Sequence, residues 1–366
     1  MQWRGVPQPP AQELPALREW LTFAGDLAEA ERQRQALQPF GLRILRRQQL
    51  PGLGLVLSVF RLPATADMQQ LERDLRTRFP DWQQELNLRY RPLAQPDAAE
   101  LQLRTWGQRA MGRGQPAPLG CGRGKLLAML DGPVNASLPE FAGADLHYQS
   151  LPPAQYGATS GEAQRHGTAV AALLIGRAEV AGLLPGARLQ AFGVFGEDRD
   201  AGLHTRSDWL ILALDRVAAL EPPPQAINLS FGGAYSQLLG QLFAQLGERL
   251  HFVAAAGNDG QAGVRYPAAY PQVLAVGAVD ARLRRLRQSN FGRHLALVAP
   301  GEDIWTLDGS GQGFYASGTS FAAPFISAAL ALAPSPQALL AQARDLGEAG
   351  RDDHYGAGLA RLPSCR

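Results

Sequence analysis

The sequence has almost no cysteine, almost no lysine and no apolar run long enough to cross a membrane. Cys121 and Cys365 are the only cysteines, which excludes a disulfide-rich framework, and two thiols fit either an oxidising or a reducing compartment. A bridge between them is a hypothesis that thiol titration of the unfolded, unreduced protein decides. The longest apolar stretches, such as 53–59 and 325–332, fall well short of the roughly 20 residues of a membrane-spanning helix. We therefore expect no membrane span.

Charge is also scarce, and the two signs nearly cancel. Charged residues make up 19% of the 366 positions and the formal net charge is +2, too small for the broad basic surface of a dedicated nucleic-acid binder. Hydrophobic residues make up 46%, enough to bury one large domain and a small one. We expect a globular protein without nucleic acid as a partner.

The N-terminus lacks the basic and then apolar pattern of a secretory signal peptide. Either the protein is cytoplasmic, or a signal was removed and a start methionine added. We expect a secreted or periplasmic protein whose signal peptide has been removed, with the cytoplasm as the alternative.

Residues 1–16 are rich in proline and glutamine, and we interpret them as an N-terminal arm. A small α+β unit follows over 17–95. Its composition and periodicity predict strands at 19–24, 42–48, 54–62 and 86–90, and helices at 27–38 and 67–79. The resulting order, βαββαβ, predicts a ferredoxin-like unit.

Residues 96–121 hold proline, glycine and polar groups, and we interpret them as a linker or processing region. Over 122–366, apolar strand-like runs alternate with helical segments. This alternation predicts an α/β domain, a doubly wound and mostly parallel sheet with helices on both faces. Active sites in such sheets lie at the carboxyl ends of the strands, so the residues that follow each run are candidates.

Asp131, His166 and Ser320 are the residue types of a catalytic triad, and each lies at the end of a strand-like run or the start of a helical one. Each also has a simpler structural interpretation. Asp131 precedes a glycine, as turn residues do, a lone histidine is usually structural, and a serine that begins a helix is usually a cap. Asn258 ends another apolar run; it is normally a turn former, but its amide is also a donor suited to an oxyanion.

The four segments around Asp131, His166, Asn258 and Ser320 together resemble the subtilases, the subtilisin-like serine proteases. Residues 318–324, Gly-Thr-Ser-Phe-Ala-Ala-Pro, match the family signature Gly-Thr-Ser-x-Ala-x-Pro, and His166-Gly167-Thr168 matches its histidine segment. Asp131-Gly132 is a looser match, because the family more often has Ser or Thr between Asp and Gly. The chain order Asp, His, Ser is that of subtilisin. Further similarity lies at 227–233, 266–271, 278–280, 299–301 and 355–359, so that the resemblance covers about 122 to 362.

The resemblance implies a serine endopeptidase that acts on proteins or peptides. Ser320 would be the nucleophile and His166 the general base and then acid, while Asp131 would hold the imidazole in the right tautomer. Asn258 and the backbone N–H of Ser320 would form the oxyanion hole.

The same resemblance implies where the substrate binds. One side of the cleft would pair with the substrate backbone as an added strand, and the other would form the wall of a side-chain pocket. The residues concerned are Ser230, Phe231 and Gly232 on the first side and Ala255, Ala256 and Gly257 on the second. Small residues in the wall favour a pocket for large apolar side chains, although they equally fit simple close packing.

The first 95 residues resemble, more weakly, the propeptide of the family. As a propeptide, the 17–95 unit would act as an intramolecular inhibitor and thread the segment after Tyr90 through the cleft until it is cut. As an independent module, it would bind another partner. The order of its elements and its position favour the first interpretation.

No cofactor and no metal site are firmly predicted. Many subtilases carry an Asn-rich calcium loop shortly after the helix of the catalytic histidine, but here the corresponding segment, 174–183, is short and offers one carboxylate. Calcium takes six to eight oxygen ligands. We expect no calcium in this loop, and a weaker calcium site elsewhere stays open.

Three other interpretations compete with this one. A catalytically silent relative that binds or inhibits peptides is the main alternative, although all four catalytic positions are filled. A nucleotide-binding enzyme is disfavoured because the glycines of 120–125 precede a strand and no Ser or Thr follows Lys125. An α/β-hydrolase is disfavoured because Ser320 is not within Gly-x-Ser-x-Gly.

Overall fold

The structure is a computed structural model, and it describes residues 18–92, 104–114, 116–156, 161–198 and 202–365. The arm predicted over 1–16 lies outside the described residues. Within them, no helix combines the length and the apolar character needed to cross a bilayer.

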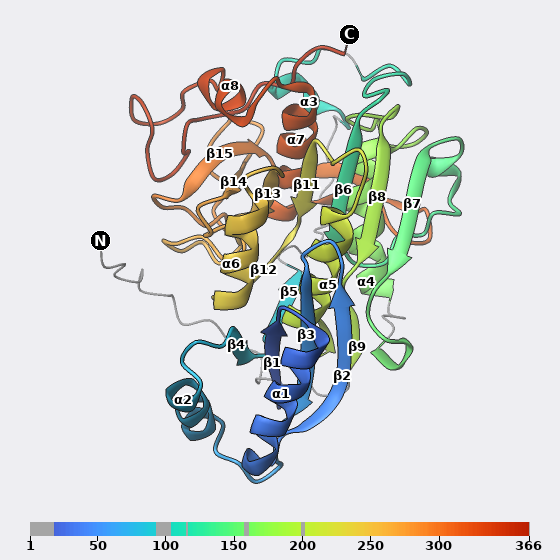
Figure 1. Ribbon diagram of the computed structural model, residues 1–366. Helices are drawn as coiled ribbons and strands as arrows, with labels where there is room; N and C mark the ends of the chain where they lie inside the picture. Colours follow the sequence, from blue (N-terminus) through green and yellow to red (C-terminus); the bar gives the residue numbers. More distant parts are fainter. Residues whose placement is uncertain (1–17, 93–103, 115, 157–160, 199–201, 366) are drawn as a thin grey trace.

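The N-terminal part is a four-stranded antiparallel sheet with two helices (Figure 1). The strands lie in the order β2-β3-β1-β4, which is that of a ferredoxin-like unit, and the predicted βαββαβ succession is confirmed. The elements are β1 (Glu19–Ala24), α1 (Leu27–Leu37), β2 (Arg43–Leu50), β3 (Leu55–Arg61), α2 (Met68–Arg78) and β4 (Gln84–Leu86).

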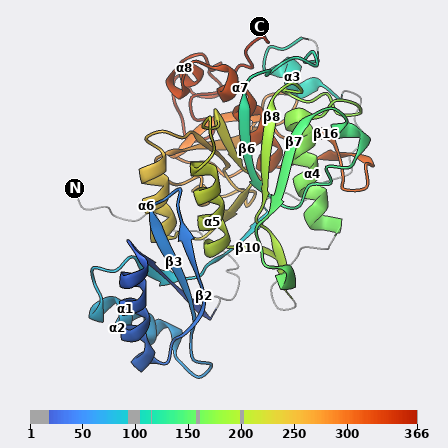
Figure 2. The same ribbon diagram turned by 45° about the vertical axis from the view of Figure 1, so that its right-hand side comes forward.

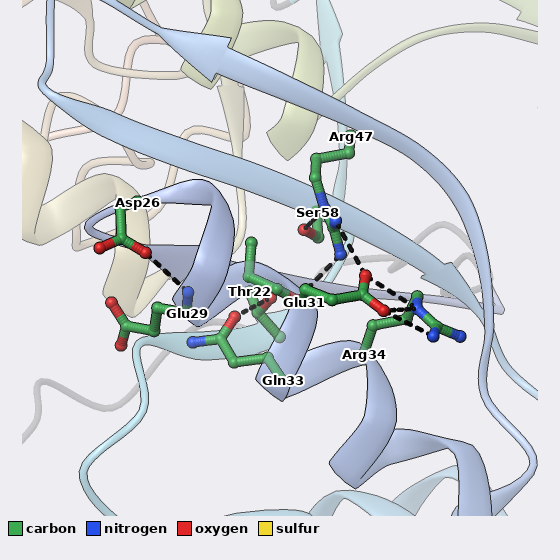
Figure 3. A network of polar contacts seen from close by, with 9 residues as sticks. Thr22, Asp26, Glu29, Glu31, Gln33, Arg34, Arg47 and Ser58 are labelled. Atoms are coloured by element: carbon green, nitrogen blue, oxygen red, sulfur yellow. Dashed lines mark hydrogen bonds and ion pairs between the residues drawn. The ribbon is translucent and has the colours of Figure 1, made fainter.

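Helix α1 is fixed on this sheet by polar contacts (Figure 3). The carboxylate of Asp26 caps the helix by accepting a hydrogen bond from the backbone N–H of Glu29 at 2.7 Å. Thr22 Oγ1 donates to Gln33 Oε1 at 2.8 Å, and Gln33 Nε2 donates to the Phe23 carbonyl at 2.8 Å. Thr22 and Gln33 are buried, so the helix has a fixed position rather than only an apolar contact with the sheet.

The larger part of the chain is built on a seven-stranded sheet in which every pair of neighbours is parallel. The order is β15-β14-β13-β11-β6-β8-β7. The predicted doubly wound, mostly parallel architecture is confirmed. The strands are β6 (Leu126–Asp131), β7 (Asp145–Ser150), β8 (Arg188–Gly193), β11 (Ala226–Leu229), β13 (Phe252–Ala255), β14 (Val273–Val279) and β15 (Leu295–Pro300).

Helices cover both faces of this sheet. Helices α4 (Gly161–Ile175) and α7 (Thr319–Leu332) share one apolar core with it, and α5 (Ser207–Ala218) and α6 (Gln237–Leu246) share another. The second core also contains residues of the N-terminal sheet, which packs against α5 and α6 (Figure 2).

Shorter elements complete the fold. A second four-stranded sheet has the order β12-β5-β10-β9, and β16 pairs with β17 as a hairpin. These elements are β5 (Arg89–Pro92), α3 (Trp106–Ala110), β9 (Gly196–Asp198), β10 (Gly202–Arg206), β12 (Phe231–Gly233), β16 (Ile304–Leu307), β17 (Gly313–Ala316) and α8 (Pro336–Ala341), with 3-10 turns η1 (Gln38–Phe40), η2 (Pro139–Phe141) and η3 (Ala154–Tyr156).

The described part of the predicted linker, from 104 to 121, packs on the larger body. A side chain in place of Gly107 would put its Cβ 2.7 Å from the ring of Phe325. The guanidinium of Arg113 donates to the Leu183 carbonyl at 2.7 Å. Cys121 and Cys365 form a disulfide. The segment is thus fastened to the larger body, and the division of the chain at residues 95 and 121 stays a prediction.

Candidate active site

The sheet brings the four candidate catalytic residues to its carboxyl edge. Asp131 is the last residue of β6, Asn258 follows β13, and Ser320 is the second residue of α7. His166 lies in the second turn of α4, not at its start as the apolar pattern predicts, because α4 begins at Gly161. Asp131 and Ser320 are fully buried and His166 is 3% exposed.

Asp131 and His166 form a direct contact. His166 Nδ1 lies 2.6 Å from Asp131 Oδ1, and the backbone N–H of Gly132 donates to the same oxygen at 2.6 Å. With Nδ1 engaged by the carboxylate, the neutral imidazole carries its proton there and its lone pair on Nε2. Nε2 is buried and has no hydrogen-bond partner in the described part of the chain. The pair therefore has the geometry of a base that is oriented by a carboxylate.

Glycine makes this contact possible. The Cβ of any other residue at Gly167 would lie 2.3 Å from the Gly132 carbonyl oxygen, closer than atoms can approach. The neighbour that Gly167 admits is the turn that follows Asp131.

Ser320 lies in the first turn of α7. Its hydroxyl donates to the Ser230 carbonyl at 3.0 Å, and the ring of the next residue, Phe321, lies 5.7 Å from the imidazole ring, centroid to centroid. Gly318, the N-cap residue, has φ +141°, a backbone conformation that residues with a Cβ rarely adopt. The chain can therefore turn sharply into the helix just before the serine.

Asn258 is oriented by Thr319, a residue to which the sequence assigns no role of its own. The backbone N–H and the hydroxyl of Thr319 both donate to Asn258 Oδ1, at 2.9 and 3.0 Å. Because these two donors identify the oxygen end of the amide, the other end is the NH₂ group, which is a donor. The half-buried Asn258 is thus tied to the first turn of α7.

A short strand of the N-terminal part lies between two strands of the larger body. Strand β5 pairs antiparallel with β12, where Gly232 lies opposite Arg91, and with β10, where Thr205 lies opposite Tyr90. Of the predicted cleft residues, Phe231 and Gly232 belong to β12, and Ser230 directly precedes it. Strand β10 has no predicted role, because the run 202–206 has no clear strand pattern.

The predicted opposite wall lies at the end of β13. Ala255 and Ala256 are fully buried. Gly257 has φ +115°, and a Cβ there would lie 2.5 Å from Asn290 Nδ2. Close packing thus accounts for the glycine at 257, and a role of the three residues in substrate binding stays a prediction.

The turn after α4 is closed by a buried carboxylate. Glu140 is 3% exposed and accepts hydrogen bonds from the backbone N–H groups of Ala178 at 3.0 Å, Glu179 at 2.8 Å and Val180 at 3.3 Å. Such a ring of N–H groups suits an anion. Among the described residues, no three His, Cys, Asp or Glu side chains gather as a metal site would require. The inner face of this turn thus presents N–H donors to a carboxylate, and the absence of calcium from it stays a prediction.

The chain is similar to known proteins. A family model described as the subtilase family matches residues 122–358. Subtilisin NAT from Bacillus subtilis subsp. natto is 33% identical over 256 residues, which cover 64% of this chain and 64% of that protein. The chain thus spans less than two thirds of the length of this relative.

Two solved structures are similar as well. The protease domain of PatA has a TM-score of 0.56 and 32% identity, covering 67% of this chain and 94% of that chain. Fervidolysin from Fervidobacterium pennivorans, described as a keratinolytic enzyme related to subtilisin, has a TM-score of 0.75 and covers 97% of this chain and 61% of that chain. Its identity is 20%, so that likeness concerns the fold alone.

We predict that the turn after α4 depends on Glu140 and not on calcium. Glu140→Ala leaves three backbone donors without their acceptor, and hydrogen bonds to a charged group are worth about 1.5 to 3 kcal/mol. The free energy of unfolding in urea should fall by about 3 kcal/mol, measured on a Ser320→Ala chain that lacks the candidate nucleophile.

The matched control is Glu179→Gln, an exposed carboxylate in the same turn that pairs with Arg104. It should change the free energy of unfolding by less than about 1 kcal/mol. A calcium chelator should leave both proteins unchanged. Equal stability of Glu140→Ala and the parent chain, or a clear loss of stability with chelator, would contradict this account.

Proposed function

The chain belongs to the subtilase family, and from this premise we propose that it is a serine endopeptidase made as a precursor that its own N-terminal unit keeps closed. The observation that carries the proposal is the 2.6 Å contact between Asp131 and His166, which leaves the lone pair on the buried Nε2, the atom that would act as the base.

In the proposed reaction, Ser320 Oγ gives up its hydrogen bond to the Ser230 carbonyl and donates to His166 Nε2 instead. His166 takes the proton as Oγ attacks the carbonyl carbon of the scissile peptide, and then passes it to the departing amine. The acyl-enzyme is hydrolysed by water through the same two proton transfers. Asp131 stabilises the imidazolium; its other oxygen, Oδ2, is buried without a hydrogen-bond partner among the described residues.

Two donors would stabilise the oxyanion, the side-chain NH₂ of Asn258 and the backbone N–H of Ser320 at the start of α7. Helix N-termini present unpaired N–H groups and the positive end of the helix dipole. Support for the role of Asn258 comes from Thr319, which holds the amide oxygen at 2.9 Å and so fixes the donor end.

The substrate would bind as an added strand in the place of β5. Ser230, Phe231 and Gly232 would supply one side of this pairing, and β10 would supply the other. Ala255, Ala256 and Gly257 would form the wall of the side-chain pocket.

The same pairing supports the inhibitory role of the N-terminal unit. Because β5 already uses the backbone groups of β12 and β10, a substrate strand cannot enter until β5 leaves. Cleavage of the chain after β5, by the protein itself, would release the unit.

Buried polar contacts hold the N-terminal unit on the body. Glu85 accepts hydrogen bonds from the Ser236 hydroxyl and from the Leu238 backbone N–H at the start of α6. Asn87 Oδ1 accepts from the Asp208 backbone N–H at the start of α5, at 3.2 Å. The two helix starts are thus capped by the N-terminal unit.

Two ion pairs cross the same interface. Arg206 of β10, 1% exposed, pairs with Glu19 of β1, and Asp208 pairs with Arg46 of β2. Separating one partner from a buried pair leaves an uncompensated charge unless water reaches it, which is costly.

We extend the proposal to the environment of the protein. The Cys121–Cys365 disulfide favours an oxidising compartment, which agrees with a secreted or periplasmic protein. The donors that surround Glu140 support a turn that works without calcium. The alternative, a catalytically silent peptide-binding relative, shares this fold but predicts no turnover.

The first prediction concerns turnover. Asn258→Ala should lower kcat on a peptide library by about 10² to 10³, the loss found when the oxyanion asparagine of subtilisin is removed. KM should change little, because the amide acts on the transition state. Ser320→Ala is the reference for zero activity. Mass spectrometry of the products measures kcat and KM.

If the protein is a silent relative, the parent chain and the Ser320→Ala chain will give the same products. If the Asn258→Ala chain is as fast as its parent, the protein is still a protease, but Asn258 is not its oxyanion donor.

The second prediction concerns pH. Burial raises the pKa of Glu85 to about 7, although the contacts at the start of α6 and the nearby Arg76 favour its charge. The docked unit therefore holds this proton more tightly than the free unit, so docking is strongest in acid and weakens as pH rises through about 7.

Thermal unfolding of a Ser320→Ala chain between pH 5 and 8.5 tests this. Adding Glu85→Gln, which cannot ionise, should leave Tm unchanged at pH 5 and raise it at pH 8, because no buried charge then forms. Glu248→Gln, at an exposed position, is the control. Parallel pH profiles with and without Glu85→Gln would exclude Glu85 as the titrating group.

A further inference from the structure

Helix α7 lacks a regular hydrogen bond at the position that matters most. In an α-helix the backbone N–H of residue i+4 donates to the carbonyl of residue i. The residue four positions after Ser320 is Pro324, which lies inside α7, has no N–H and crowds that carbonyl. The carbonyl of the proposed nucleophile is therefore without its usual donor.

Ser230 supplies a donor in its place. Its hydroxyl donates to the Ser320 carbonyl at 2.9 Å, while its own carbonyl accepts from Ser320 Oγ at 3.0 Å. Both residues are fully buried. The Ser230 hydroxyl thus faces α7, whereas the backbone that follows it enters β12.

Two further side chains fix the direction of this hydrogen bond. Asn228 Nδ2 donates to Ser230 Oγ at 2.9 Å, and Ser327 Oγ donates to Asn228 Oδ1 at 2.9 Å. Because Ser230 Oγ already accepts a hydrogen bond, its single proton is directed to the Ser320 carbonyl. Ser327 lies two turns after Ser320 on α7, so the chain of hydrogen bonds leaves α7, crosses to β11 and returns to the start of α7.

We propose that Ser230, Asn228 and Ser327 are positioning residues that hold the first turn of α7, and with it Ser320, at the place from which attack occurs. The proposal rests on the proposed function. Asn228 and Ser327 are, like Ser230, 0 to 1% exposed, and a buried polar chain in which each partner is satisfied is rigid. It sets the position of Ser320 Oγ relative to His166 and of the Ser320 N–H relative to the oxyanion.

The consequence is a loss in kcat without a loss in KM. Ser230→Ala removes the substitute donor and leaves the Ser320 carbonyl unpaired in the interior, so that the first turn relaxes. Substrate pairs with the backbone of β12, which the substitution keeps. A misplacement of about 1 Å costs on the order of 10²-fold in rate.

A double-mutant cycle between Ser230 and Pro324 tests the mechanism. Ser230→Ala should lower kcat by about 10-fold to 100-fold with KM unchanged. Pro324→Ala restores an N–H four residues after Ser320 and so offers the carbonyl its regular donor. The double variant should therefore lose less than the product of the two single losses, with about 10-fold of kcat recovered relative to Ser230→Ala.

Active sites are counted by labelling with a fluorophosphonate, so that kcat refers to folded protein. The control is Ser310→Ala, which removes an exposed hydroxyl. Ser327→Ala, which removes the outermost hydroxyl of the chain, should give a smaller kcat loss of the same kind and serves where Ser230→Ala does not fold.

The outcomes separate the two claims. A parent chain that neither turns over nor labels after it has been cut behind β5 overturns the proposed function. The positioning role is overturned if the parent is active but Ser230→Ala keeps its kcat or changes KM alone. It is also overturned if the kcat loss of the double variant equals the product of the losses of Ser230→Ala and Pro324→Ala. An unchanged kcat in Ser327→Ala overturns it as well.

Discussion

The site depends on how closely α4 approaches the end of β6. A Cβ at Gly167 would lie 2.3 Å from the Gly132 carbonyl, so only glycine permits the approach that puts His166 Nδ1 2.6 Å from Asp131 Oδ1. That contact decides which imidazole nitrogen carries the lone pair, and hence which atom can act as the base. The position of Ser320 is set by a second close approach, where α7 begins directly after Gly318 and contacts Ser230.

In the proposed function, the strand position beside β12 serves both substrate recognition and inhibition. Strand β5 pairs with β12 and β10 through backbone groups. Because backbone pairing does not depend on the identity of the side chains, an internal segment and a substrate can occupy the same strand position. The N-terminal unit is held there by Glu85 and Asn87 at the starts of two helices. The docking of the N-terminal unit therefore depends on buried polar groups whose charge and hydration change when the unit dissociates.

Local patterns account for what the sequence predicts well. Short runs of residues are enough to predict the ferredoxin-like order, the parallel sheet and the segments around Asp131 and Ser320. Contacts between distant segments are not predictable in this way. The bond from Thr319 to Asn258 spans 61 positions and that from Glu179 to Glu140 spans 39, and nothing in either segment alone points to the other. The start of α4 is missed because the residues before His166 are polar and break the apolar pattern.

The central claim is that Ser320 is a working nucleophile that the N-terminal unit covers in the intact chain. Reaction of Ser320 with a fluorophosphonate, followed by mass spectrometry of the labelled peptide, measures this directly in the intact chain and in a chain cut after β5. The account predicts that the cut chain is labelled at Ser320 and the intact chain far more slowly. Equal rates in the two forms, or no label on Ser320 after the cut, would contradict it.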